Sequence, residues 1–196
     1  MKDAGPAAEP LWVRRILSAP GLAFAVLWGL GEGTLFFVVP DVLLTLAAIF
    51  RPRRALLHIA AATAGATLAG ALMFIWASRT PASARAAVAH VPFVRESMFA
   101  RAQDELQSHG FRGLLLGPRY GIPYKVYAVE APNFLSWPSF LAMTVPARLM
   151  RFVLSSLFFA VLGFVLKNAR LGRPATLAGI HAILWIAFYA YYWSKI

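Results

Sequence analysis

The stretch Gly117–Lys125, which reads GPRYGIPYK, decides how this chain is interpreted. It places Arg119 and Lys125 in an apolar region that two prolines and two glycines break. An earlier stretch, Gly29–Asp41, is broken in the same way and carries two acidic residues. Charged groups at membrane depth usually face a cavity or a partner, and non-helical backbone persists there only inside protein or beside water. Together the two stretches predict a polar cavity inside a membrane protein, which favours a transport site.

The composition places the chain among integral membrane proteins. Of its 196 residues, 60% are hydrophobic and only 14% are charged, whereas an ordinary soluble domain is about one quarter charged. The mean hydropathy is +0.64. The length suits one compact, multi-pass, all-helical bundle and leaves no room for a separate soluble domain.

The net charge of +11 raises the question of a nucleic-acid ligand. That class is rejected because the basic residues form short clusters between apolar runs instead of covering one polar face. Such clusters are typical of loops that set membrane topology and contact anionic headgroups. Cysteine is absent, which excludes disulfides, thiolate metal sites and thiol nucleophiles.

The spacing of the apolar runs predicts two re-entrant hairpins. Residues 1–18 are expected to form an N-terminal segment in the cytoplasm or at the membrane interface. From Ala19 to Phe50 the chain is too long for one span of about 20 residues and too short for two. We therefore expect a hairpin that enters and leaves by the same face. The segment Phe111–Pro132 is broken in the same way and predicts a second hairpin.

About three further runs are long enough to span a membrane. Ala55–Trp76 is uninterrupted and rich in small residues that favour close helix contact. Leu135–Leu166 predicts an interfacial turn near Trp137 and then one kinked span, while Ala175–Trp193 predicts a last span ending in interfacial aromatics. Between them, Arg79–Gly110 is polar with a partial apolar face, which favours an amphipathic connector on the surface over a lid.

Two basic loops determine the expected orientation. Arg51–Arg54 and Lys167–Arg173 contain no acidic residue, so both should face the cytoplasm. The connector Arg79–Gly110 then lies outside, and the two hairpins enter from opposite faces. Each half consists of a hairpin followed by a spanning helix, in opposite orientation, which is the inverted-repeat architecture of secondary transporters.

Three motifs in this chain resemble the DedA family, whose domain is also called VTT and carries the older label "SNARE-associated". They are the acidic stretch Glu32–Asp41, the broken stretch Gly117–Lys125, and the basic helical stretch Pro146–Phe152. In the second motif, Lys125 takes the place of the family's second arginine at the same six-residue spacing. The resemblance covers roughly residues 19–166, and residues 167–196 add a basic loop and a C-terminal membrane helix.

The resemblance implies that the chain translocates an anionic lipid, such as a phospholipid or a polyprenyl phosphate, with proton coupling suspected. It also implies a multi-pass protein of the cell membrane, taken here as the bacterial inner membrane. Membrane lipids are therefore the expected partners. No cofactor is expected, and a homo-oligomer stays open.

Four basic residues are candidates for contact with the phosphate group. Arg119 either holds a phosphate by a forked contact or forms a structural ion pair with an acid of the first hairpin. Lys125 is either a second phosphate contact or a side chain that reaches the outer interface. Arg148 and Arg151 lie three residues apart on one helical face. Both could line the cavity. Alternatively, Arg148 could anchor the helix at the outer interface.

Three acidic residues are candidates for a proton carrier or a counter-ion. Glu32, at the tip of the first hairpin, is either a proton carrier or a fixed counter-ion to Arg119. Asp41 opens a helix, so a proton role competes with simple N-capping. Glu130 is expected at the outer water interface. His181, on the last span, is expected to be a hydrogen-bonded packing residue.

Two other function classes compete with translocation. One is a scaffold that organises other membrane proteins without transporting anything, and the other is an intramembrane enzyme acting on lipid phosphates. The sequence has no Gly-x-Ser-x-Gly or His-Glu-x-x-His motif, and its four histidines lack metal-ligand spacing. It also has no glycine-rich phosphate loop, which argues against an ATP-driven pump. We therefore expect a transporter and not an enzyme.

Overall fold

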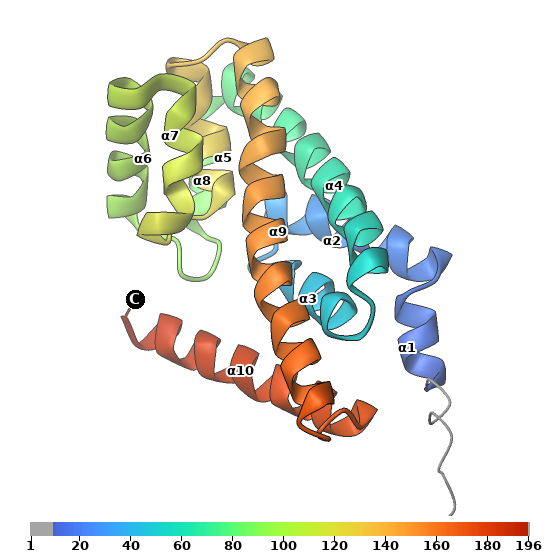
Figure 1. The fold of residues 1–196 in the computed structure, drawn as a ribbon. Coiled ribbons are helices and arrows are strands. Elements are labelled where there is room, and N and C mark those ends of the chain that lie inside the picture. The colour runs from blue at the N-terminus through green and yellow to red at the C-terminus, as the bar shows by residue number, and fades with distance from the viewer. Residues whose placement is uncertain (1–9, 196) are drawn as a thin grey trace, which may run out of the picture.

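The computed structural model describes residues 10–195, except for the side chains of Leu116, Pro118, Arg119 and Lys195. Every regular element in this part of the chain is a helix, so the all-α prediction is confirmed (Figure 1). The helices, in chain order, are α1 (Leu11–Ile16), α2 (Ala19–Gly33), α3 (Asp41–Phe50), α4 (Pro52–Arg79), α5 (Pro81–Ala89), α6 (Glu96–His109), α7 (Gly113–Leu116), α8 (Tyr124–Glu130), α9 (Trp137–Asn168) and α10 (Pro174–Lys195), with short 3-10 helices η1 (Gly110–Arg112), η2 (Gly117–Tyr120) and η3 (Ala131–Asn133).

Three helices, α4, α9 and α10, are long and apolar enough to cross a membrane, and they contain the three predicted spans. At 1.5 Å per residue, the 32 residues of α9 extend about 48 Å, well beyond a hydrocarbon core of about 30 Å. The interfacial turn predicted near Trp137 is not a separate element, because Trp137 is the first residue of α9. Pro138 is accommodated in its first turn, where a missing N–H costs nothing, and Pro146 lies within it.

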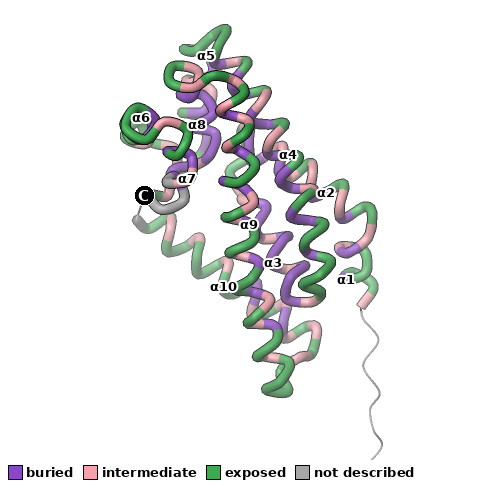
Figure 2. Tube along the Cα trace, turned by 45° about the horizontal axis from the view of Figure 1, so that its top comes forward, coloured by how far each residue is buried: buried purple, intermediate pink, exposed green. Residues whose placement is uncertain are grey.

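The outer faces of α9 and α10 are apolar and uncovered (Figure 2). Only 22% of the most apolar window of α9, and 11% of that of α10, is buried inside the protein. Contiguous exposed apolar surface of this extent is rare in soluble monomers. These faces therefore need apolar surroundings, which a lipid bilayer supplies.

Two parallel helices, α2 and α4, pack with their backbones in direct contact. A Cβ atom added at Gly29 would lie 2.2 Å from the carbonyl oxygen of Ala62, and one at Gly65 would lie 2.0 Å from that of Val26. Only glycine fits at such distances, as in the close helix contacts of membrane proteins. The small residues of α4 therefore serve packing, as the sequence indicated.

The chain doubles back between α2 and α3. The start of α2 and the end of α3 lie at the same end of α4, where Arg54 donates to the carbonyl oxygen of Leu17 (3.3 Å) and Ala48 packs in one cluster with Leu17 and Ala55. The bend, residues 34–40, lies farther along α4, where Gly33 contacts Ala69. With 15 and 10 residues, α2 and α3 reach only about 22 and 15 Å.

The second broken segment, α7 to α8, approaches from the opposite end of α4. The hydroxyl of Tyr124, at the start of α8, lies against Gly70 and 2.9 Å from the hydroxyl of Thr144 on α9. The chain then returns to the far end, where Trp137 packs on Phe74 with ring centroids 5.2 Å apart. Because Ala69 and Gly70 are neighbours, the bend at residues 34–40 and a second bend, at residues 117–125 between α7 and the start of α8, meet at the same height on α4.

The connector between the two halves differs from the prediction of a surface-lying segment. It forms two helices, α5 and α6, and α6 buries Phe99, Ala102 and Leu106 in the same cluster as α8. Its partial apolar face is thus covered by protein. The cause is the second broken segment, whose short helices need apolar partners that α4 and α9 alone do not supply.

The two acid-free basic loops lie at one end of the bundle. Lys167, at the end of α9, donates to the carbonyl oxygen of Ile49 at 2.9 Å, next to the loop that begins at Arg51. α5 lies at the opposite end because it follows the far end of α4. This arrangement agrees with the expectation that both basic loops face the same side.

The last helix, α10, begins beside the end of α9 and then diverges from it (Figures 1 and 2). Near its start, Leu177 packs against Ile49 and Phe159. Near its end, Trp193 stacks on Phe93 with ring centroids 4.8 Å apart. α10 therefore bridges from the basic end of the bundle to the loop between α5 and α6.

Candidate functional site

A cavity of about 310 Å³ lies where the two bends meet. Its walls come from both bends, from α9 and α10, and from the loop at residues 91–94. Four sequence-selected residues line it, namely Glu32, Asp41, Lys125 and Arg151. The sequence thus identified the charged wall of the cavity.

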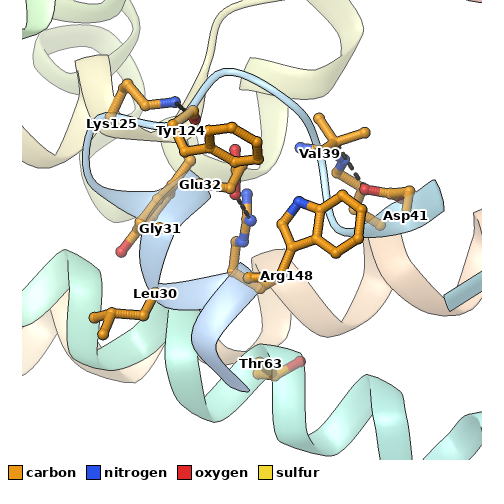
Figure 3. Close-up of polar contacts among 12 residues, drawn as sticks. Leu30, Gly31, Glu32, Val39, Asp41, Thr63, Tyr124, Lys125 and Arg148 are labelled. Carbon is orange, nitrogen blue, oxygen red and sulfur yellow. Dashed lines mark hydrogen bonds and ion pairs between the residues drawn. The ribbon is translucent and has the colours of Figure 1, made fainter. Parts of the chain in front are cut away.

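Glu32 is held by Arg148. Arg148 rises from α9 and donates to the carboxylate of Glu32, at the end of α2 (Figure 3). Its guanidinium lies between two rings, 5.0 Å from the centroid of Tyr124 and 4.7 Å from that of Phe152. Both charged side chains are only 3% exposed. Arg148 does not line the cavity, so the pair is a clamp between α2 and α9.

Asp41 is held by a second arginine, one turn farther along α9. Its carboxylate accepts from Arg151 at 2.8 Å and from the hydroxyl of Ser155 at 2.7 Å. The alternative of an N-cap is wrong, because Asp41 is the first residue inside α3 and its side chain makes no capping bond. The carboxylate instead points across the bend to α9, so this pair ties α3 to α9 at the wall of the cavity.

Lys125 forms no direct ion pair with an acidic side chain among the residues that the structure describes. It is only 2% exposed, and its Nζ donates to the carbonyl oxygen of Phe36 at 3.2 Å. This bond joins the two bends directly. The alternative that Lys125 reaches the outer interface is therefore wrong, because the side chain turns inward to an unpaired carbonyl of the other bend.

Among the side chains that the structure describes, the charges around the cavity do not balance. Three basic residues (Lys125, Arg148 and Arg151) face two acidic ones (Glu32 and Asp41), and each acid already has an arginine. In their charged forms these groups leave one positive charge in excess. A buried excess charge is costly unless a partner arrives, so the site is suited to an anion.

Glu130 and His181 lie outside the cavity. The side chain of Arg119 is outside the described residues. Glu130 is buried instead of facing water, because Arg85 and Gln103 both donate to it at 2.7 Å. His181 is a buried packing residue as expected, with its ring 2.9 Å from the hydroxyl of Thr45 and 5.0 Å from the ring of Phe159.

Sequence reasoning missed three contributors to the site. Ser155 follows Arg151 by four residues, and that spacing on one helix face was a usable signal. Tyr124 supports Arg148 through its ring. Tyr189 of α10 accepts from the backbone N–H of Val39 at 3.1 Å, inside the first bend. No periodicity could have indicated these last two contacts, because they depend on how distant helices pack.

No group of three or more histidine, aspartate or glutamate residues in the described part of the chain could hold a metal ion. Comparisons of the chain with models of protein families, with curated proteins and with solved structures find no match. The resemblance to the DedA family therefore stays a prediction that rests on its three motifs.

Proposed function

We propose that this protein moves an anionic lipid from one leaflet of a membrane to the other, as a flippase or scramblase of the DedA type. In this proposal α2–α3 and α7–α8 are re-entrant hairpins that enter from opposite faces and form an inverted repeat. The observation that carries the proposal is Lys125, a buried lysine that forms no ion pair among the described residues and lines a cavity between the two bends.

Lys125 and Arg151 bind the lipid phosphate. Lys125 gives up a neutral carbonyl oxygen for the phosphate, which is a better acceptor. Arg151 exchanges Asp41 for the phosphate, and Ser155 keeps the released carboxylate hydrogen-bonded. Asp41 then takes up a proton, which offsets the negative charge of the bound phosphate. This step would couple the movement of the lipid to the movement of protons. Arg119 joins the phosphate site through the family motif.

The cavity has a second, aromatic wall that suits the rest of an amphipathic lipid. It comes from α10 and the first bend, with Trp185, Phe188, Tyr189 and Phe37 among its members. One wall thus offers charge and the other offers apolar rings. A site of this kind accepts a charged headgroup together with the first methylene groups attached to it.

A neighbouring hollow provides access from the end where α5 and α6 lie. It has a volume of about 400 Å³, is lined by Arg95 and Arg101, and shares Gly121, Ile122 and Tyr192 with the cavity. The hydroxyl of Tyr192 donates to the carbonyl oxygen of Gly121 at 3.1 Å, so this contact separates the two spaces. Arg95 and Arg101 would attract headgroups toward the contact between Tyr192 and Gly121.

Transport in vesicles tests the proposal. Purified protein is reconstituted with a fluorescent anionic lipid, and an impermeant quencher reports how fast inner-leaflet lipid reaches the outside. Losing a charged contact costs about 1.5–3 kcal/mol, so Lys125→Met should slow movement by about tenfold or more. Lys167→Met is the matched control, because Lys167 also donates to backbone carbonyls but does not line the cavity.

The outcomes separate the competing functions. If the Lys125→Met protein moved lipid at the wild-type rate, Lys125 would not be the phosphate contact that the proposal requires. A wild-type protein that neither moves nor changes lipids would support the scaffold, and a new lipid product in mass spectra would support the enzyme. Lys125→Arg should retain part of the activity, because the charge remains while the shape of the group changes.

The proposed topology puts the basic loops in the cytoplasm of a bacterial cell. The chain has no cysteine, so single cysteines can be introduced at the exposed positions Arg53, Arg170 and Ser108. An impermeant thiol reagent added to intact cells should label position 108 and spare positions 53 and 170. Labelling at 53 from outside would reverse the assignment.

A further inference from the structure

A second cavity, far from the two bends, is surrounded by arginines. It has a volume of about 310 Å³ and is lined by Arg14, Leu17, Ser18, Arg51 and Arg54. The three arginines come from three separate elements, which are α1, the turn after α3, and the first turn of α4. Arg14 and Arg54 form no ion pair with an acidic side chain of the described residues, so these two arginines supply positive charge to the cavity.

Helix polarity adds to the positive potential of this cavity. α2 and α4 are parallel and both begin here, at Ser18 and Arg51, without a side-chain cap and without an acidic residue in the first turn. Helix N-termini carry a partial positive charge and favour anions. The nearby C-terminus of α1 is offset by Arg54, which donates to the carbonyl oxygen of Leu17 at 3.3 Å.

The surroundings of the cavity are those of a membrane interface. On α1, Leu11 is 76% exposed, and Trp12 is partly exposed and packs edge-on against Phe50 at 5.4 Å. Tryptophan of this kind marks the headgroup level of a bilayer. Two exposed leucines, Leu56 and Leu57, follow the arginines on α4. Charge at headgroup level with apolar surface beside it matches one molecule of anionic lipid.

We infer that this arginine-lined cavity is a binding site for the phosphate headgroup of an anionic lipid, whose acyl chains lie along the exposed leucines of α4. The site is separate from the translocation cavity and does not depend on it, since the two share no lining residue. It anchors the protein to anionic lipid at the basic end of the bundle. A free phosphate offers the same charge but none of the apolar contact.

The chain supplies matched controls for this inference. Arg15 and Arg53 are direct neighbours of Arg14 and Arg54 and carry the same charge, but they do not line the cavity. A general attraction of basic residues to anionic membranes would depend on all four arginines equally. A built site would depend on Arg14 and Arg54 and be indifferent to Arg15 and Arg53.

Native mass spectrometry of the full chain in detergent, titrated with phosphatidylglycerol, tests the site. Removal of one charge-assisted contact should weaken binding by about tenfold in Arg14→Gln and Arg54→Gln, and by less than about twofold in Arg15→Gln and Arg53→Gln. Phosphatidylcholine should bind weakly to all of them. Glycerol phosphate and inorganic phosphate should compete only at much higher concentration than the lipid.

Several results would overturn the inference. Equal losses in all four variants would show diffuse attraction, and unchanged binding in Arg14→Gln would show that the cavity holds no headgroup. Equal competition by inorganic phosphate would identify a free-anion site instead. Arg54→Gln also loses the bond to Leu17, so Arg14→Gln, which breaks no described hydrogen bond, is the deciding variant. The Arg14 effect should persist in Lys125→Met, which separates this site from the translocation cavity.

Discussion

The two acid–arginine pairs on α9 look alike in sequence but differ in their surroundings. Glu32–Arg148 is buried on both sides, with each side chain 3% exposed, and its arginine stays outside the cavity. Asp41–Arg151 lies at the cavity wall, where the Arg151 side chain is 24% exposed and Ser155 shares the carboxylate. The same chemistry therefore serves two purposes. The first pair fixes the bend against α9, and in the proposed function the second exchanges its acidic partner for the lipid phosphate.

The largest expected effect is a loss of stability when the buried pair is broken. Arg148→Met leaves the carboxylate of Glu32 buried without its partner, which costs about 3–5 kcal/mol. Unfolding in detergent, followed by tryptophan fluorescence, measures this loss. The double change Arg148→Met with Glu32→Gln should recover most of it, because neither charge remains. If Arg148→Met were no less stable than Arg151→Gln, the contrast between the pairs would be wrong.

The second effect is on lipid movement and not on stability. Arg151→Gln should lower the free energy of unfolding by only about 1 kcal/mol, because Ser155 still bonds Asp41 and the site is partly open. It should nevertheless slow lipid movement by about tenfold, since a phosphate contact is lost. Parallel unfolding and vesicle assays measure both quantities. If Arg151→Gln were destabilised but moved lipid at the wild-type rate, Arg151 would have the same structural role as Arg148 and would not bind the phosphate.

The third effect concerns the response to pH. Asp41 can exchange its partner, whereas Glu32 is clamped, so Asp41→Asn should flatten the pH dependence of lipid movement more than Glu32→Gln does. Rates in vesicles at a series of pH values measure the slope. Each variant is compared at equal folded fraction, because Glu32→Gln also leaves Arg148 unpaired. An unchanged slope in Asp41→Asn would exclude Asp41 as the proton carrier.

The smallest effect is expected at Ser155. Ser155→Ala removes one hydrogen bond to Asp41 while Arg151 remains, so the unfolding free energy should fall by about 1 kcal/mol or less. Lipid movement should change by no more than about twofold. The matched control is Ser156→Ala, since the Ser156 hydroxyl is buried without a hydrogen-bond partner among the described residues. A loss at Ser155 as large as at Arg151 would make the serine part of the exchange.

Much of the fold could be predicted from the sequence. Long apolar runs determined α4, α9 and α10, and glycine and proline marked both bends, because these features depend on local composition alone. The acidic and basic residues of the bends also pointed to the cavity. Glu32, Asp41, Lys125 and Arg151 were selected because a charge in an apolar region needs a partner or a cavity.

The pairing of those residues could not be predicted. As a counter-ion, Glu32 was expected to pair with Arg119 of the other broken segment, yet its partner is Arg148 of the unbroken helix α9. Which acid pairs with which arginine depends on the position along α9 at which each bend packs. The periodicity of the sequence contains no information about that position. Glu130 was misplaced for the same reason, since the packing of α5 and α6 onto α8 brings Arg85 and Gln103 to it.

Among the described residues, α10 alone forms one side of the cavity. Its inner residues line the cavity, while Ile183 and Ile186 on its outer side are 66% and 68% exposed. If a headgroup enters by a sideways displacement of α10, the fatty tails need never leave the bilayer. The protein would then sort its cargo by charge alone and remain indifferent to tail length and unsaturation.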